Sequence, residues 1–121
     1  MRILIVEDEA LSGLMIEDEL EARGWHTALA WTAEAALREA RAGRFDLALV
    51  DLGLPDMDGA ELVRRLRAVD PGMPVVVCTG YAAEDAKLRG LPDGTAVLRK
   101  PCLAPDLLRA VEAAVPRSRD R

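Results

Sequence analysis

Three short runs of apolar residues, separated by longer segments, constrain the fold of this chain more than any other feature. The runs occupy residues 3–6, 47–50 and 75–78, and each is apolar at every position. Such a strand is typical of a parallel sheet covered by helices, because both of its sides are then buried. Two weaker runs, at residues 25–30 and 96–98, complete a set of five predicted strands.

The segments between these runs have the spacing of amphipathic helices, with apolar residues recurring every three or four positions. The predicted helices lie at or near residues 10–23, 33–40, 62–69, 82–88 and 107–115. Alternation of strands and helices predicts right-handed crossovers that place helices on both faces of the sheet. The expected fold is therefore α/β, a (βα)5 doubly wound parallel sheet of five strands in one domain.

Local residue types add detail to the first two predicted helices. Thr32 is a suitable N-cap for the second helix, and Gly24 and Gly43 are suitable C-terminal caps. The inward-facing positions of the first helix are predicted to be Leu11, Met15, Ile16 and Leu20.

Composition excludes several functional classes. The net charge is -5 and no basic patch stands out, so binding of a nucleic-acid backbone is not expected. No apolar run approaches the roughly 18 residues of a membrane span, and no leader precedes the first strand, so a cytoplasmic location is expected. Cys78 and Cys102 lack metal-like spacing; reduced thiols are the favoured interpretation, with a disulfide as the alternative.

Polar residues follow four of the five predicted strands. They are Glu7, Asp8 and Glu9 after the first, Asp51 after the third, Thr79 after the fourth, and Arg99, Lys100 and Pro101 after the fifth. In parallel sheets of this kind a site forms beyond the carboxyl ends of the strands. We therefore expect these side chains to converge at one edge of the sheet.

Clustered carboxylates repel one another, and a hard divalent cation relieves that repulsion. Mg²⁺ prefers oxygen ligands, whereas the absence of a His or Cys cluster argues against zinc. With Mg²⁺ bound, Asp51 could act as a nucleophile toward phosphorus and form an acyl phosphate. The Lys100 ammonium and the Thr79 hydroxyl could each hold an oxygen of the transferred group.

Each of these residues also has an ordinary interpretation. The acidic residues after the first strand suit a solvated helix N-terminus, and Asp51 suits a turn. Thr79 could cap a helix, and Lys100 could be a surface lysine. The convergence of all of them at the ends of the appropriate strands favours the functional interpretation.

Taken together, the order and spacing of these residues resemble the receiver domains of two-component response regulators, from Arg2 to about Val115. The resemblance rests on the Glu7-Asp8 pair, the "VDLGLPDMDG" segment, Thr79 and the Lys100-Pro101 pair. It implies a flavodoxin-like sheet with strand order 2-1-3-4-5. The receiver domain would occupy residues 1–115, followed by a polar tail at 116–121.

The resemblance also implies roles for individual residues. Asp51 would accept a phosphoryl group from a phosphohistidine of a histidine kinase or a histidine phosphotransfer protein. Mg²⁺ would be bound by Asp51, by Asp8 directly, by Glu7 largely through water, and by the backbone carbonyl of Gly53. Lys100 and Thr79 would hold phosphoryl oxygens.

The chain departs from the family pattern near its switch residues. Val97 stands where the family usually carries an aromatic that moves inward with the threonine, and Cys102 replaces the phenylalanine that usually follows Lys100-Pro101. The "CTGY" segment resembles that of an alphaproteobacterial subgroup named for its FATGY motif, which also lacks that aromatic. We expect Tyr81 to shield the phosphoryl group or to take part in the switch with Thr79.

A proline after a strand can adopt the cis form, so the Lys100-Pro101 peptide bond is a candidate cis bond that would fix the approach of the lysine. The expected output is protein binding or phosphate relay by a stand-alone domain without an effector. That domain would be a monomer or a phosphorylation-dependent dimer through the face of the fourth helix, fifth strand and fifth helix.

Two alternatives remain at this point. A Mg²⁺-dependent phosphohydrolase would also use an aspartate nucleophile, a threonine and a lysine. However, hydrolases of the haloacid-dehalogenase type carry the nucleophile in a DxD pair near the start of the chain, whereas Asp51 follows the third strand and residue 53 is Gly. The other alternative is a pseudo-receiver that only binds a partner, which an intact acceptor, metal pair and lysine disfavour. An enzyme that turns over a separate substrate is not expected.

Overall fold

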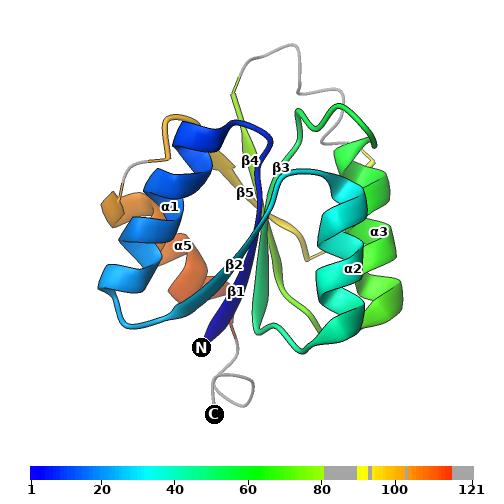
Figure 1. Cartoon of the computed structure of the whole chain (residues 1–121), viewed down its shortest axis with the longest axis horizontal. Helices are drawn as coiled ribbons and strands as arrows, with labels where there is room; N and C mark the ends of the chain where they lie inside the picture. The colour runs from blue at the N-terminus through cyan, green and yellow to red at the C-terminus, as the bar shows by residue number, and fades with distance from the viewer. Residues whose placement is uncertain (81–89, 93, 103, 116–121) are drawn as a thin grey trace.

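All five predicted strands are present and form one parallel sheet in the computed structural model, which describes residues 1–80, 90–92, 94–102 and 104–115 (Figure 1). The strands are β1 (Arg2–Val6), β2 (His26–Ala30), β3 (Leu47–Asp51), β4 (Val75–Thr79) and β5 (Ala96–Arg99). Their order across the sheet is β2-β1-β3-β4-β5. The flavodoxin-like order 2-1-3-4-5 is confirmed, and the three fully apolar runs are the three central strands.

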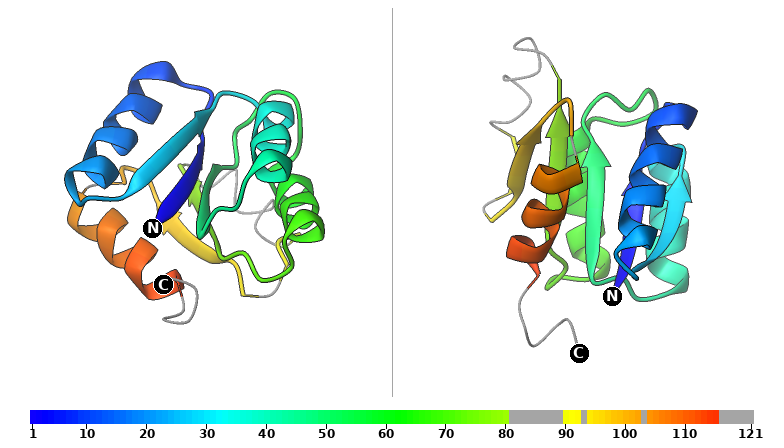
Figure 2. Two further views of the ribbon diagram at one scale, coloured as in Figure 1. Left: turned by 60° about the horizontal axis from the view of Figure 1, so that its bottom comes forward. Right: turned by 90° about the vertical axis from the view of Figure 1, so that its left-hand side faces the viewer.

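Helices cover both faces of the sheet. They are α1 (Ala10–Ala22), α2 (Ala33–Ala42), α3 (Gly59–Val69) and α5 (Ala104–Ala114). Helices α1 and α5 lie on one face, and α2 and α3 lie on the other (Figure 1). The right-hand view of Figure 2 shows the same arrangement from the side, with α1 and α5 both in front of the sheet. The helix predicted at residues 82–88 and the tail at 116–121 lie outside the described residues.

The central strands supply side chains to both helical layers, which explains why they are apolar throughout. Ile3 and Ile5 of β1 pack on the α1/α5 side. Leu4 and Val6 pack on the α2/α3 side. Because successive side chains of a strand point to opposite faces, an interior strand between two layers has no position left for a polar residue.

The predicted inward face of α1 is only partly right. Ile16 and Leu20 pack on the sheet, but Leu11 is 67% exposed and Met15 is 60% exposed. The physical reason is the close approach of the helix at Gly13, where an added Cβ would lie 3.1 Å from a methyl carbon of Leu29. Because α1 contacts the sheet at Gly13, the side of the helix that carries Gly13, Ile16 and Leu20 faces inward. Leu11 and Met15 are left at the surface.

The predicted caps are confirmed. The Thr32 hydroxyl accepts a hydrogen bond from the Ala35 N–H at 3.1 Å, at the N-terminus of α2. Gly43 occupies the C-terminal cap of that helix. Gly24, just beyond α1, has a φ of 93°, a left-handed conformation that favours glycine.

Candidate functional site

The register of the parallel strands brings the predicted site residues to one edge of the sheet. The last paired residues of β1 and β3 are Val6 and Val50, so the acids that follow them, Glu7 and Asp51, lie side by side. The Lys100 N–H donates to the Thr79 carbonyl at 2.8 Å, which ties the end of β5 to the end of β4. Four separate segments therefore meet where the sequence predicts a site.

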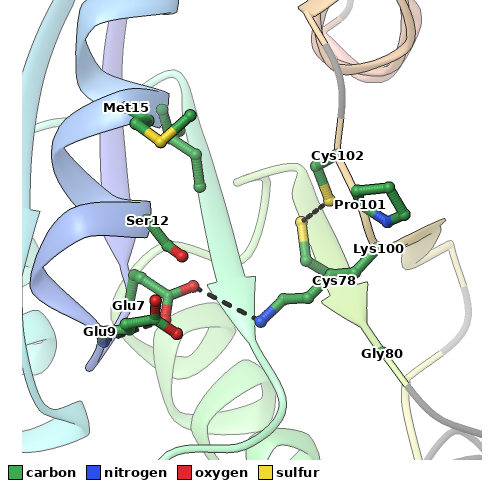
Figure 3. A pocket seen from close by; sticks show the side chains of 10 residues that line it. Glu7, Glu9, Ser12, Met15, Cys78, Gly80, Lys100, Pro101 and Cys102 are labelled. Atoms are coloured by element: carbon green, nitrogen blue, oxygen red, sulfur yellow. Dashed lines mark hydrogen bonds and ion pairs between the residues drawn. The ribbon is translucent and has the colours of Figure 1, made fainter.

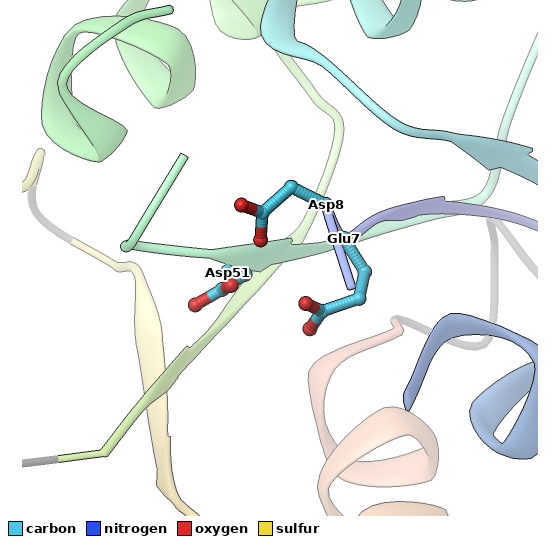
Figure 4. Close-up of side chains that lie close together, drawn as sticks. All are labelled: Glu7, Asp8 and Asp51. Carbon is cyan, nitrogen blue, oxygen red and sulfur yellow. The ribbon is translucent and has the colours of Figure 1, made fainter. Parts of the chain in front are cut away.

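Three carboxylates converge at this edge. Oxygen atoms of Glu7, Asp8 and Asp51 all lie within 4.8 Å of one another. Figure 4 shows the three side chains turned toward a common space at the end of β3. Glu7 is only 2% exposed and Asp51 only 7%, whereas Asp8 is exposed. Two buried acids beside one open to solvent form an oxygen-only ligand set of the kind that a hard divalent cation prefers.

Asp51 is held in place by two donors on the same oxygen. Its Oδ1 accepts a hydrogen bond from the Gly53 N–H at 3.1 Å and lies 3.3 Å from the Lys100 Nζ. The carboxylate is thus oriented by the turn that follows it and partly neutralised by the lysine. The metal-binding role of the Gly53 carbonyl stays a prediction.

Lys100 lies between the two buried acids. Its Nζ is 3.7 Å from Glu7 Oε2 (Figure 3), and it also contacts Asp51. Burial opposes its charge, but the Asp51 and Glu7 carboxylates outweigh burial and raise the pKa of the lysine. The Lys100-Pro101 peptide bond is cis, as the sequence suggested. The ammonium therefore stays charged beside Asp51 across the physiological pH range.

The surroundings of Glu7 change the pKa of its carboxyl group. Burial raises its pKa to about 7, and the negative charge of Asp51 adds to this effect. The Glu9 N–H, which donates to Glu7 Oε1 at 3.1 Å, and Lys100 work in the opposite direction without compensating fully. One lysine therefore does not neutralise the cluster, and a further cation would stabilise it.

The three predicted switch residues differ in where the structure places them. Thr79 is fully buried at the end of β4. Val97 is 45% exposed on the edge strand β5 and so is not packed in the core. Tyr81 lies outside the described residues, so its predicted role stays a prediction. The switching roles of Thr79 and Val97 stay predictions as well.

The loop after Asp51 is fixed by two contacts that the sequence did not reveal. The Asp56 carboxylate accepts hydrogen bonds from the first two N–H groups of α2, those of Ala33 at 3.0 Å and Glu34 at 3.2 Å. The Ala33 hydrogen bond is the main reason that the pKa of Asp56 is lowered. At Gly59 an added Cβ would lie 2.3 Å from Leu52 Cδ2, so any larger residue there would require the buried Leu52 side chain to move.

A cavity of about 590 Å³ opens beside Lys100, between the end of the sheet and α1. Glu7, Lys100 and both cysteines are among its lining residues (Figure 3). The sequence indicated the charged residues of this cavity, whereas it raised the two cysteines only as an alternative disulfide pair and did not place them at the site. Cys78 and Cys102 are distant in sequence, and only the path of the chain through β5 brings them together.

Comparison with known proteins gives a consistent result. The family model for the response regulator receiver domain matches residues 3–112. A response regulator receiver protein of Anaeromyxobacter is 40% identical over 108 residues, covering 88% of this chain and 45% of that protein. The transcriptional regulatory protein CusR of Escherichia coli is 33% identical over 118 residues, covering 97% of this chain and 52% of that protein. The chain thus spans about half the length of these curated relatives.

Solved structures show the same similarity. A CheY-like response regulator receiver domain protein from Methanospirillum hungatei superposes with a TM-score of 0.82 at 35% identity, covering 93% of this chain and 90% of that one. The receiver domain of the hybrid histidine kinase CckA gives a TM-score of 0.81 at 29% identity, covering 96% and 100%. No helix within the described residues is long and apolar enough to cross a membrane.

Proposed function

Because the chain belongs to the response regulator receiver domain family, we propose that Asp51 is a phosphoacceptor that takes a phosphoryl group from a phosphohistidine of a partner protein. One observation carries the proposal. The buried Asp51 carboxylate lies 3.3 Å from the Lys100 ammonium and shares its surroundings with the carboxylates of Glu7 and Asp8. The family is a signalling module rather than a classical enzyme, and nothing in the site favours a phosphohydrolase.

In the proposed reaction, a carboxylate oxygen of Asp51 forms a bond to phosphorus while the phosphorus–nitrogen bond of the donor breaks. The electron pair of that bond returns to the imidazole, and the product is an acyl phosphate on Asp51. The Gly53 N–H orients the carboxylate before the reaction. Positioning of this kind is the main contribution that a protein makes to phosphoryl transfer.

The residues present fit Mg²⁺. Their donors are oxygens only, two of the three carboxylates are buried, and one lysine faces three carboxylates. Burial, with a smaller contribution from Asp51, raises the pKa of Glu7, so a bound cation would favour its ionised form. Asp8 and Asp51 would bind the ion, with Glu7 assisting and the Gly53 carbonyl as a further ligand. When bound, the ion supplies positive charge that offsets the charge on the phosphoryl oxygens.

Two side chains would complete the recognition of the phosphoryl group. The Lys100 ammonium, already beside Asp51, would contact one of its oxygens. Thr79, at the end of the neighbouring strand, would contact another through its hydroxyl. Movement of Thr79 would then carry the change outward, and we infer that Val97 and Tyr81 take part in this switch.

We infer a partner set from this chemistry. The donor would be a histidine kinase or a histidine phosphotransfer protein in the cytoplasm, and the phosphorylated form would bind a target protein, a second copy of the domain, or pass the phosphate on. Direct contact of this domain with nucleic acid or a membrane is not part of the proposal. The β5 and α5 portion of the output face carries the exposed Val97.

The test is a mass measurement on the intact protein. With Mg²⁺ and a small phosphodonor such as acetyl phosphate, we expect one added phosphoryl group that is absent from Asp51→Asn. Asp46→Asn is a matched control, because Asp46 lies at the opposite end of β3 and accepts a hydrogen bond from the Arg2 N–H. Continuous phosphate release without an adduct would indicate a hydrolase. Absence of an adduct, even with a donor kinase, would indicate a binding module.

A further inference from the structure

The two cysteines of the chain lie in contact beside the phosphoacceptor site. Cys78 is a buried residue of β4, and Cys102 follows the Lys100-Pro101 bond just before α5. Their sulfur atoms are 3.2 Å apart, and Figure 3 shows the two thiols facing each other across the end of the cavity. Both are free thiols in this structure. A disulfide requires an S–S distance of about 2.05 Å, so the sulfurs need to approach by only about 1.2 Å.

We propose that Cys78 and Cys102 are a redox-active pair that closes to a reversible intramolecular disulfide when a peroxide reaches the cavity, and that this closure slows phosphoryl acceptance at Asp51. The first half of the proposal concerns the thiols alone. The second half rests on the function proposed above. In a reducing compartment the pair stays open until oxidant is present.

Access and chemistry assign the first step to Cys102. Both thiols line the cavity, but Cys102 is half-buried, whereas Cys78 is only 3% exposed and belongs to the core of the α1/α5 layer. The hydrogen bond with Cys78 lowers the pKa of Cys102 against the opposing effect of burial. A more exposed thiol that deprotonates more readily is the one that reacts first with an oxidant.

The reaction balances with one peroxide molecule. The Cys102 thiolate attacks a peroxide oxygen, the O–O bond breaks, and the products are a sulfenic acid and water once the leaving hydroxide is protonated. The Cys78 sulfur then attacks the Cys102 sulfur, the S–O bond breaks, and the hydroxyl leaves as water with the Cys78 proton. Two thiols lose two electrons to the peroxide, and a dithiol reductant reverses the bond by exchange.

The pair is coupled to the acceptor through the sheet and through the lysine segment. Cys78 is the residue of β4 that faces Asp51 in the register of β3 and β4. Cys102 comes two residues after Lys100, whose Nζ lies 3.3 Å from Asp51 Oδ1. Since β4 is a central, buried strand, the Cys102 segment makes most of the movement and carries Lys100 with it. Misplacement of a positioning group by about 1 Å can slow a reaction by up to about a hundredfold.

The disulfide is tested on the full chain with hydrogen peroxide and mass analysis without reductant. We expect a cross-linked peptide pair containing Cys78 and Cys102, lighter by two hydrogens than the separate peptides, which dithiothreitol separates again. Cys102→Ser should give no such species, and Cys78→Ala should behave the same way if it folds. Oxygen gain on the cysteine peptides without cross-linking, or a covalent dimer of the chain, would overturn the proposal.

The coupling is tested by the rate of phosphorylation of reduced and oxidised protein with the same small donor. We expect the oxidised form to react between about tenfold and about a hundredfold more slowly. Dithiothreitol should restore the rate, and peroxide should not change the rate of Cys102→Ser. Equal rates of the two wild-type forms would overturn the coupling. A reduced protein that accepts no phosphate would overturn the proposed function and the coupling with it, whereas the disulfide is judged by mass alone.

Discussion

The two helical layers pack against the same sheet but differ in what they enclose. Between the sheet and α2 and α3 the buried side chains form a continuous apolar cluster that runs from Leu4 to Val77. Between the sheet and α1 and α5 the apolar cluster is smaller, and by the alternation of the strands Glu7, Asp51 and Cys78 fall on this side. The cavity beside Lys100 opens on this side as well.

The difference shows how a small domain combines a stable core with a reactive site. The α2/α3 layer contains the larger set of fully buried apolar side chains, which support the strands. The α1/α5 layer contains charged side chains, a cavity and a pair of thiols at the carboxyl edge of the sheet. Clustered acids reduce stability unless their charge is balanced, so the apolar packing of the α2/α3 layer offsets the cost of the acids in the α1/α5 layer.

The largest expected effect compares buried leucines in the two layers. Leu62 of α3 and Leu107 of α5 are both fully buried. Leu62→Ala should lower the free energy of unfolding by about 4–5 kcal/mol and Leu107→Ala by about 2–3 kcal/mol, because the cost of a cavity depends on how completely its surroundings are packed. Urea denaturation measures both values.

A matched control for these truncations is Leu11→Ala on the exposed side of α1. It should change the free energy of unfolding by less than about 0.5 kcal/mol. If Leu107→Ala proved as costly as Leu62→Ala, the proposed contrast in packing between the two layers would be wrong.

The same contrast explains how much could be predicted from the sequence. Strands buried on both faces leave an unmistakable apolar pattern, so the sheet and the residues at its carboxyl edge were predictable. The inward face of α1 was not, because Leu11, Met15 and Leu20 are equally apolar and only the close contact at Gly13 selects among the faces.

Contacts between distant parts of the chain form a second class that the sequence could not reveal. The Thr32 cap is local and was predicted from its position before a helix, whereas Asp56 caps the same helix from a different loop. The Cys78-Cys102 contact likewise depends on how β5 returns beside β4. Short-range chemistry is readable in a sequence, but pairings across loops require the folded path.

The next effect concerns the charge of the reactive layer. Because burial raises the pKa of Glu7 to about 7, the folded protein holds this proton more tightly than the unfolded chain does. The stability that comes from binding this proton is fully present when the pH is below the ordinary glutamate pKa near 4.5. It is lost as the pH rises to about 7, the pKa of Glu7 in the folded protein. The loss is on the order of 3 kcal/mol in metal-free protein.

Thermal or urea unfolding of wild-type protein and of Glu7→Gln between pH 4.5 and pH 8 measures this effect. The difference between their free energies of unfolding removes the contribution of the other carboxylates, which both proteins share. The wild type should lose stability relative to the variant as the pH rises. Mg²⁺ should reduce the loss, because a bound cation favours the ionised form of Glu7. A difference that is independent of pH without metal would show that the acidic cluster does not strain the fold.

The smallest expected effect tests the contact between the two regions. Asp56 belongs to the loop after Asp51 but accepts hydrogen bonds from the first N–H groups of α2, so it fastens the loop of the site to the α2/α3 layer. Asp56→Ala should lower the free energy of unfolding by about 1 kcal/mol, as the loss of a helix cap does, and Asp56→Asn should lower it by less because one acceptor oxygen remains. Since Asp51 keeps its own donors, Gly53 and Lys100, the yield of phosphorylated protein should not change. A strong loss of phosphorylation in Asp56→Ala at unchanged stability would mean that the α2/α3 layer orients the acceptor directly, and the division between a supporting layer and a reactive layer would have to be abandoned.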